Sequence, residues 1–400
     1  MMQIANPLFI PGPTNIPERV RLAMARSAWD HRGPRFAELI RPLRERLTAV
    51  LGSREATVAF FTGSGTAGWE VALTNLLCSG DRVLATRHGM FSQRWIDLAR
   101  RLGLEVEVID APWGEGIPAD SLTEVLRADR QQRIRAVLAV HNETATGVTS
   151  DIGAVRRALD AAGHPALLMV DGVSSIASLP FHMDDWGVDV AVAGSQKGFM
   201  LPTGLAIVAV SPRARAATAE HPGPRGYLDL SAMLEALEAG SYPYTPAVGL
   251  LEALNESLAM LHEEGLEVVY ARHARIAAGV RAAVGAWGLE QCARRRSLAS
   301  DTVTTIRVPE GFSADAVVQH AQTRYGVSFG IGLGQLADRV FRIGHLGQMS
   351  EAMALAGIAT AEMTLLDLGF PITAGSGVAA AQDQYRQTER VMPRQQAGGA

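Results

Sequence analysis

Residues 188–198 read Val-Asp-Val-Ala-Val-Ala-Gly-Ser-Gln-Lys-Gly. The first six positions are mostly apolar, which is typical of a strand buried in a parallel sheet. Lys197 follows the end of this strand among small residues, where packing does not explain a long cationic side chain. A desolvated lysine amine has a lowered pKa and can form a Schiff base as a nucleophile. Lys197 is therefore the candidate catalytic residue.

A second apolar strand, Ala166–Val170, runs directly into Asp171. Ligands of open α/β sheets bind at the carboxyl ends of the strands, so Asp171 and Lys197 are expected at one edge. An amine for an aldehyde and a carboxylate for a pyridinium nitrogen are what pyridoxal 5′-phosphate requires of a protein. We therefore predict pyridoxal 5′-phosphate as the cofactor, although Asp171 alone could equally cap the turn that follows it.

The composition is that of a globular chain: 400 residues, 48% hydrophobic and 20% charged, with a net charge of −4. This charge provides no basic field for nucleic acid or anionic lipid. The two cysteines are too few for a disulfide framework and favour a reducing compartment. We see neither a secretory leader pattern nor an apolar run of membrane-spanning length, so we expect a cytoplasmic protein. The histidines and cysteines lack metal-ligand spacing, so no metal is expected.

Short apolar segments alternate with amphipathic helical segments between about residues 55 and 210. This alternation predicts an α/β fold in which helices cover a mostly parallel, seven-stranded sheet. The predicted strands are Thr57–Phe61, Arg82–Ala85, Glu105–Ile109, Arg135–Val140, Ala166–Val170, Val188–Ala193 and Leu205–Val210.

The flanking regions have different patterns. Residues 1–30 read as a proline-rich arm with a short helix, and residues near 31–50 as a helix. A long helix is expected over about 247–284 with a break near Gly265, before an α+β region with strands Thr302–Val308 and Val340–Ile343. From about residue 376 a polar, frayed segment is expected. The predicted division is an arm (1–30), a large domain (31–260), a small C-terminal domain (261–375) and a tail (376–400).

A glycine-rich turn, Thr62–Gly68, follows a predicted strand and opens a helix. Backbone N–H groups at a helix N-terminus bind phosphate, so the turn predicts a phosphate site. It also matches the G-x-G-x-x-G dinucleotide pattern, but the next strand runs into Thr86 and Arg87 rather than a ribose-binding acid. An NAD(P)-dependent dehydrogenase stays open as the less favoured alternative, because it would leave Lys197 and Asp171 without a role.

Three further features are candidates for the same edge. The polar segment His141–Gly147 could contact the cofactor ring through a hydroxyl, or its threonines could simply cap a loop. Arg342 lies in an apolar strand, where it predicts either a structural salt bridge or bidentate capture of a substrate α-carboxylate. Phe91 could stack on the pyridine ring or belong to the core.

At this point several segments resemble the class V aminotransferases of pyridoxal phosphate fold type I, and within them the amino acid–glyoxylate aminotransferases. The serine–glyoxylate branch and its aspartate–glyoxylate relatives are the most similar. The segments that carry the likeness are Gly194–Lys197, Val170–Ser175, Phe341–Gly344, Pro11–Pro17, His141–Gly147, Tyr242–Pro246 and Gly375–Val378. The likeness extends over about residues 7–385.

The resemblance implies a ping-pong transamination from aspartate, serine or alanine to glyoxylate, giving glycine and a 2-oxo acid. Lys197 would form the internal aldimine and shuttle the proton, Asp171 would pair with the ring nitrogen, and Thr144 would contact the ring hydroxyl. The residues implied at the cofactor phosphate are Ser64, Gly65, Thr66 and Gln196, with Tyr242 and Thr245 from the neighbouring subunit. The active unit would therefore be a homodimer, alone or within a tetramer.

The resemblance also implies that Arg342, helped by Pro11 and Gly12, binds the substrate carboxylate. Phe91 stands where the alanine–glyoxylate members stack a tryptophan on the ring. Aspartate or serine is the favoured donor, but a lyase or a pyridoxamine–pyruvate transaminase would need the same lysine and aspartate. His31 and Arg32 could meet a second substrate carboxylate, although surface or interface pairing is favoured.

Overall fold

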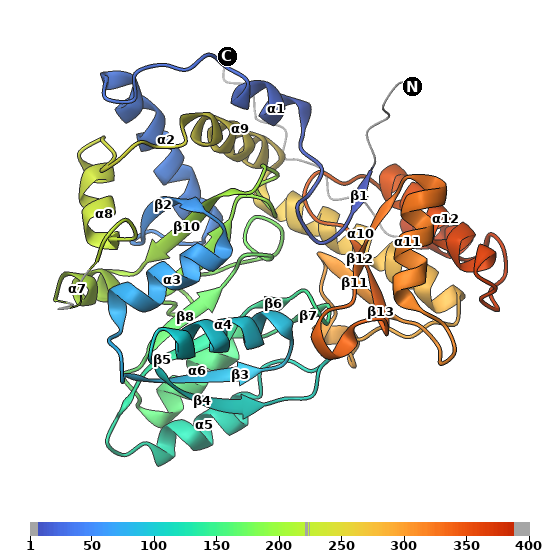
Figure 1. Cartoon of the computed structure of the whole chain (residues 1–400), viewed down its shortest axis with the longest axis horizontal. Helices are drawn as coiled ribbons and strands as arrows, with labels where there is room; N and C mark the ends of the chain where they lie inside the picture. The colour runs from blue at the N-terminus through green and yellow to red at the C-terminus, as the bar shows by residue number, and fades with distance from the viewer. Residues whose placement is uncertain (1–6, 221–222, 224, 388–400) are drawn as a thin grey trace.

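The computed structural model describes residues 7–220, 223 and 225–387, and a seven-stranded sheet forms its larger part (Figure 1). The strand order is β2-β10-β9-β8-β5-β3-β4. The strands are β2 (Thr57–Gly63), β3 (Arg82–Arg87), β4 (Glu105–Asp110), β5 (Ile134–Val140), β8 (Leu167–Asp171), β9 (Val190–Gly194) and β10 (Gly204–Val210). Strand β10 is antiparallel to both neighbours, and the other pairs are parallel. The predicted α/β fold with a mostly parallel, seven-stranded sheet is confirmed.

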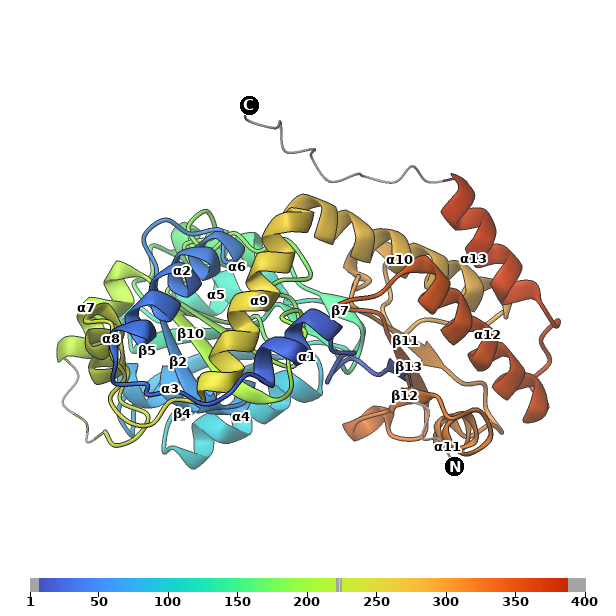
Figure 2. The ribbon, with the colours of Figure 1, turned by 90° about the horizontal axis from the view of Figure 1, so that it is seen from above.

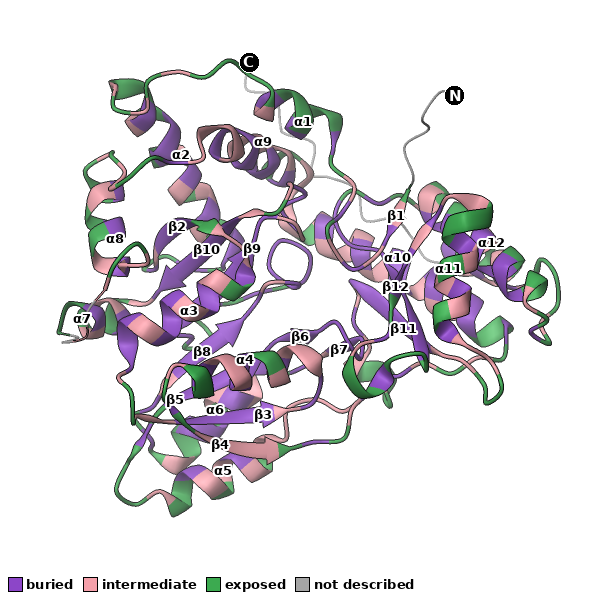
Figure 3. Ribbon diagram, in the orientation of Figure 1, coloured by how far each residue is buried: buried purple, intermediate pink, exposed green. Residues whose placement is uncertain are grey.

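Helices cover both faces of this sheet. Figure 2 shows α3 and α4 on one side and α2 and α6 on the other. The helices of this part of the chain are α1 (Glu18–Met24), α2 (Pro34–Val50), α3 (Gly65–Leu76), α4 (Met90–Arg101), α5 (Ala119–Ala128), α6 (Ile152–Ala162), α7 (Pro212–Glu220), α8 (Leu230–Glu238) and α9 (Val248–Glu264). The central strands are apolar along their whole length because both of their faces are buried (Figure 3).

A second, four-stranded sheet has the order β1-β12-β13-β11. Its strands are β1 (Leu8–Phe9), β11 (Val303–Arg307), β12 (Ser328–Ile331) and β13 (Val340–Gly344), and its helices are α10 (Leu266–Ala286), α11 (Ala314–Tyr325), α12 (Glu351–Asp367) and α13 (Ser376–Gln387). Strand β1 pairs with β12, so the N-terminal arm belongs to this sheet and Phe9 to its core. The sequence patterns did not predict β1 or β12, which are too short to show a clear period.

The helix break predicted near Gly265 is present, because α9 ends at Glu264 and α10 begins at Leu266. The described residues form two main hydrophobic cores, and the chain passes from one to the other within α10. The prediction of a frayed segment from residue 376 is wrong for residues 376–387. Helix α13 forms there because Tyr385 is buried against α10 and donates a hydrogen bond to the Ile276 carbonyl. The end of the predicted tail, 388–400, lies outside the described residues, among which no helix is long and apolar enough to cross a membrane.

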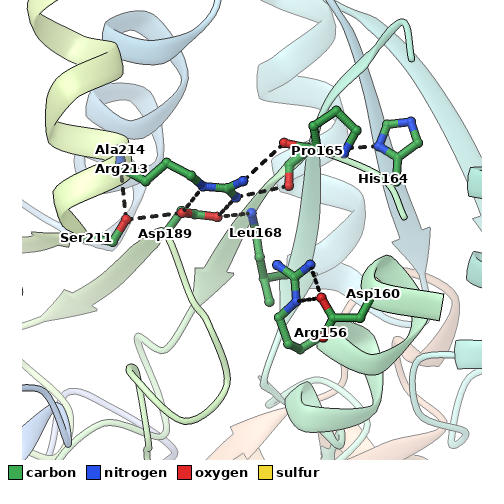
Figure 4. Close-up of polar contacts among 10 residues, drawn as sticks. Arg156, Asp160, His164, Pro165, Leu168, Asp189, Ser211, Arg213 and Ala214 are labelled. Atoms are coloured by element: carbon green, nitrogen blue, oxygen red, sulfur yellow. Dashed lines mark hydrogen bonds and ion pairs between the residues drawn. The ribbon is translucent and has the colours of Figure 1, made fainter. Parts of the chain in front are cut away.

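Asp189, just before β9, ties three strands together (Figure 4). Its carboxylate accepts hydrogen bonds from the Leu168 N–H (2.8 Å), the Ser211 hydroxyl (3.1 Å) and the guanidinium of Arg213. Arg213 also donates to the Ala166 carbonyl at 3.2 Å. Asp189 is buried whereas the Arg213 side chain is 48% exposed, so the network depends mainly on the carboxylate.

We expect Asp189→Ala to destabilise the protein by about 3 kcal/mol, because it leaves a buried N–H group without its charged acceptor. Asp160→Ala is the matched control, since the Asp160 side chain is 64% exposed and forms an ion pair with Arg156 one helical turn away (Figure 4). The control should change stability by no more than about 1 kcal/mol. Thermal unfolding of the two variants checks this, and equal shifts in both would contradict a tying role for Asp189.

Candidate active site

The polar residues singled out in the sequence follow strands that end at one edge of the large sheet. Strands β5, β8 and β9 are parallel, so their last residues, Val140, Asp171 and Gly194, lie at the same edge. Strand β2 also ends there, because antiparallel β10 separates it from β9 and pairs Gly63 with Gly204. This is the edge at which open α/β sheets bind ligands.

The N-terminal arm closes over Lys197. The Lys197 Nζ donates a hydrogen bond to the Pro11 carbonyl. Thr14 donates from its N–H to the Gln196 carbonyl and from its hydroxyl to the Lys197 carbonyl, both at 3.3 Å. Gly12, with φ of +111°, is where a side chain would overlap that of Lys197, so only glycine fits here. The predicted residues Pro11, Gly12, Gln196 and Lys197 are therefore brought together.

Burial sets the charge states of Lys197 and Asp171. Removal of water, and after it the Arg342 charge, lower the pKa of the Lys197 amine to about 8, while the Asp171 charge opposes this shift. Burial raises the pKa of Asp171 to about 7, although its Oδ1 accepts a hydrogen bond from the Val173 N–H at 2.7 Å. Asp171 thus caps the turn after β8, and its buried carboxylate would also gain from a cationic hydrogen-bond donor.

The glycine-rich turn lies beside these residues, with the Gly65 backbone close to Gly194 and Val173. Ser64 precedes α3, but its hydroxyl makes no capping bond, and Thr66 is exposed in the first turn. A side chain at Gly65 would overlap Val173, so glycine is required for the turn to approach β8. The Gln196 Oε1 is buried and has no hydrogen-bond partner within the described part of the chain. The free N–H groups of this first helical turn suit an anionic ligand. The Gln196 Oε1 is an acceptor, so Gln196 could meet an anion only through its side-chain NH₂ donors.

Arg342 lies on β13 with only 6% of its surface exposed. Its Nε donates to the Ile331 carbonyl at 2.8 Å, and its Nη1 donates to the Thr144 carbonyl at 3.1 Å. Arg342 forms none of the ion pairs found among the described residues, so the structural salt bridge that we weighed from the sequence is absent there. Burial lowers its pKa to about 10. The guanidinium therefore stays cationic at neutral pH and keeps N–H groups for a carboxylate.

Thr144 lies in the turn of a short hairpin next to Arg342. The hairpin pairs β6 (Asn142–Glu143) with β7 (Val148–Thr149) directly after β5. Thr144 is buried, and its carbonyl rather than its hydroxyl makes the contact to Arg342. The segment His141–Gly147, for which a capped loop was one of two interpretations, thus contains a hairpin that is bonded to Arg342 of the second core.

Phe91 lies half-buried in the first turn of α4, and the Arg94 guanidinium lies 5.4 Å from the centroid of its ring. The Phe91 N–H donates to the carboxylate of Glu143 at 3.0 Å. The sequence reasoning missed Glu143. The signal that could have found it is an acid three residues after the mostly apolar β5, next to the candidate Thr144.

The remaining candidates lie elsewhere on the single chain. The Tyr242 hydroxyl donates to the Phe60 carbonyl at 3.0 Å, and Thr245 is exposed. His31 and Arg32 lie in the turn before α2. Their predicted contacts with cofactor or substrate remain predictions. No group of three or more His, Cys, Asp or Glu side chains among the described residues could hold a metal ion.

Comparisons with known proteins agree over nearly the whole chain. A family model described as aminotransferase class V matches residues 9–332. The L-aspartate–glyoxylate aminotransferase of Paracoccus denitrificans is 59% identical over 387 residues, which are 97% of this chain and 98% of that protein. The serine–glyoxylate aminotransferase of Methylorubrum extorquens is 53% identical over 387 residues, 96% of each chain. The solved structure of ureidoglycine–glyoxylate aminotransferase from Bacillus subtilis matches with a TM-score of 0.88 at 26% identity, covering 96% of this chain and 99% of that one.

We expect the Lys197 amine of the ligand-free protein to titrate near pH 8. Arg342→Gln should raise its pKa because a neighbouring cation is removed, and Asp171→Asn should lower it because an anion is removed. The pH dependence of acetylation at Lys197, followed by mass spectrometry of the peptide, measures these shifts. Shifts of the opposite sign would show that other groups set the charge of the amine.

Proposed function

The chain belongs to the class-V aminotransferase family, and from this premise we propose that it transfers the α-amino group of a small amino acid to glyoxylate, producing glycine and a 2-oxo acid. Relatives at 59% and 53% identity are named as aspartate– and serine–glyoxylate aminotransferases, which supports glyoxylate as the acceptor and aspartate or serine as the donor. The observation that carries the proposal is the buried pair of Lys197 and Asp171 at one edge of the large sheet, together with the buried Arg342 of the second sheet, which is bonded to Thr144 at that edge.

We infer that pyridoxal 5′-phosphate is the cofactor, because the groups at this edge fit it. Asp171 would meet the protonated ring nitrogen, which relieves the penalty of a buried carboxylate. The first turn of α3, with Ser64, Gly65 and Thr66, would hold the phosphate, and Gln196 would add its side-chain NH₂ donors. When bound, the cofactor supplies an aldehyde that takes up the amino group and a ring that draws electrons from the substrate Cα. Phe91 and Thr144 are proposed against the ring and its hydroxyl.

The chain's own residues then orient the substrate and move its proton. Arg342 uses Nε and one Nη1 proton on backbone carbonyls, so its remaining N–H groups can bind the substrate carboxylate beside Pro11 and Gly12. The Lys197 Nζ takes the proton from the substrate Cα and returns it later, a task for which a pKa near 8 is well matched. The two half-reactions alternate on the same lysine, which is a ping-pong scheme.

Two other functions are less well supported. A dehydrogenase that uses the Thr62–Gly68 turn for a dinucleotide would leave the buried Lys197 and Asp171 without a task. A lyase or a pyridoxamine–pyruvate transaminase would use the same residues, so only substrate tests separate it from the proposed reaction. We also propose a cytoplasmic location, which rests on the paucity of cysteines.

We propose that the active unit is a homodimer with shared sites, alone or within a tetramer. The loop from Tyr242 to Pro246 supports this, because Tyr244 and Thr245 are exposed at its tip. The ring centroids of Tyr227 and Tyr244 lie 5.2 Å apart, and both side chains are exposed. A second copy of the chain could cover this pair of rings. In that arrangement Tyr242 and Thr245 would reach the phosphate of the partner.

A panel of amino donors tests the reaction. We expect aspartate or serine to give the highest kcat/KM with glyoxylate, above alanine, with glycine as the product. Lys197→Ala should lower kcat by at least about 10²–10⁴-fold, because the proton-transferring amine is lost. Preferred turnover of pyridoxamine with pyruvate, or no glycine from any donor, would reject the proposal.

Mixed dimers test the shared site. One chain carries Lys197→Ala and the other carries Tyr242→Phe with Thr245→Val, so each homodimer has two defective sites. If sites are shared, the mixed dimer holds one intact site and we expect about half of the wild-type kcat. If each chain forms its site alone, mixing restores nothing, which would contradict this proposal.

A further inference from the structure

Glu143 is a fully buried carboxylate to which the proposed mechanism gives no task. It accepts hydrogen bonds from the N–H groups of Phe91 at 3.0 Å, Ser92 at 2.9 Å and Ala145 at 3.2 Å. A side chain at Gly89 would overlap the carboxyl group, so α4 begins directly against it. The anion therefore stabilises the N-terminus of the helix that presents Phe91 to the site.

Local helix capping does not take the place of the buried glutamate here. The Ser92 hydroxyl accepts from the His88 and Gly89 N–H groups, at 3.1 and 3.0 Å, but these groups precede the first turn of α4. The N–H groups of that turn, at Phe91 and Ser92, would ordinarily be capped by a short polar side chain at the N-cap, where Gly89 stands instead. Glu143 comes from a different strand, and its charge can be buried because N–H groups of α4 and of its own hairpin bond it.

The backbone beside Glu143 leads directly to the carboxylate-binding candidate. The next residue, Thr144, accepts a hydrogen bond from Arg342 Nη1 at 3.1 Å. The Glu143 charge opposes the lowering of the Arg342 pKa by burial, and it adds to the raised pKa of Asp171. Three of the groups proposed to contact cofactor or substrate thus sense this one carboxylate: Phe91 through its N–H, and Arg342 and Asp171 through charge.

We propose that Glu143 is a positioning residue, which orients the Phe91 ring towards the cofactor and Arg342 towards the substrate carboxylate from a single buried group. This inference rests on the proposed function, since it assigns those tasks to Phe91 and Arg342. Glu143 itself touches neither cofactor nor substrate. It couples the first turn of α4, in the large core, to β13 in the second sheet.

Glu362 offers a matched control in the second core. It lies on α12, is buried, and accepts from the Trp287 indole at 2.8 Å and from the N–H groups of Gly375 at 2.5 Å and Gly377 at 2.6 Å. Like Glu143, it is a buried carboxylate at a helix N-terminus, here that of α13. It contacts none of the residues proposed to bind cofactor or substrate.

The test compares Glu143→Gln with Glu362→Gln in the cofactor-loaded protein. We expect Glu143→Gln to raise the KM of the amino donor about 10- to 100-fold, the effect of losing charge-assisted hydrogen bonds. The alkaline limb of the kcat/KM profile should move to lower pH, because the pKa of Arg342 falls when the Glu143 charge is removed. The circular dichroism of the bound cofactor should change as Phe91 is released. Glu362→Gln should lower thermal stability only.

A purely structural role would give a different result. If both variants lose stability while the KM, the alkaline limb and the cofactor dichroism stay at wild-type values, the proposal is wrong. If Glu143→Gln does not fold, Glu143→Asp replaces it. This variant keeps the negative charge, but its side chain is shorter by one methylene group. The cofactor dichroism should therefore change, whereas the alkaline limb of the kcat/KM profile should not. An unchanged dichroism would again reject the proposal.

A failure of the proposed function can be told apart from a failure of this inference. Binding of an unreactive carboxylate, succinate, is measured on both variants by isothermal titration calorimetry across pH, with no turnover required. Weaker binding at alkaline pH in Glu143→Gln alone would support the positioning role even if glyoxylate were not the acceptor. Equal binding in both variants would overturn it.

Discussion

A lysine amine and an aspartate carboxylate, both held out of water at the ends of neighbouring strands, impose the constraint on which the rest of the molecule depends. Desolvation pushes the pKa of Lys197 down to about 8 and that of Asp171 up to about 7. Both groups are therefore close to losing their charge near neutral pH, and a bound group of opposite charge would stabilise the charged form of each. The apolar strands that precede them, buried on both faces, are what keeps water from the two groups.

The site is also divided between two cores, so it exists only when they are held together. Pro11 follows β1, a strand of the second sheet, yet its carbonyl accepts a hydrogen bond from Lys197, which follows β9 of the large sheet. In the other direction, Arg342 of the second sheet donates to Thr144 of the hairpin after β5. These two crossing contacts place an amine, a carbonyl and a guanidinium around one space. A shift of either core would separate the groups that the chemistry needs together.

Strong periodic patterns explain which parts of this arrangement could be predicted from the sequence. Strands β8 and β9 are continuous apolar runs, so their positions, and with them the placement of Asp171 and Lys197, follow from local pattern. Strands β1 and β12 escaped prediction because pairing with distant segments, not their own short patterns, makes them strands. Helix α13 was not predicted because its sequence is mostly polar, and the burial of its Tyr385 depends on contact with α10. Glu143 looked like a loop residue because its donors come from another helix.

The charges of the site are balanced before any ligand arrives. Lys197 and Arg342 face Asp171 and Glu143, so the buried set holds two potential cations and two potential anions. A phosphate bound at the first turn of α3 would add negative charge where helical N–H groups, and not one of these cations, can meet it. A substrate carboxylate would then draw on Arg342, leaving Lys197 opposite Asp171. Glu143 is the one member of the set that no ligand would reach, because backbone N–H groups enclose it. Glu143 therefore holds the start of α4 and the hairpin that carries Thr144 in one arrangement, and Arg342 is bonded to the carbonyl of that same Thr144.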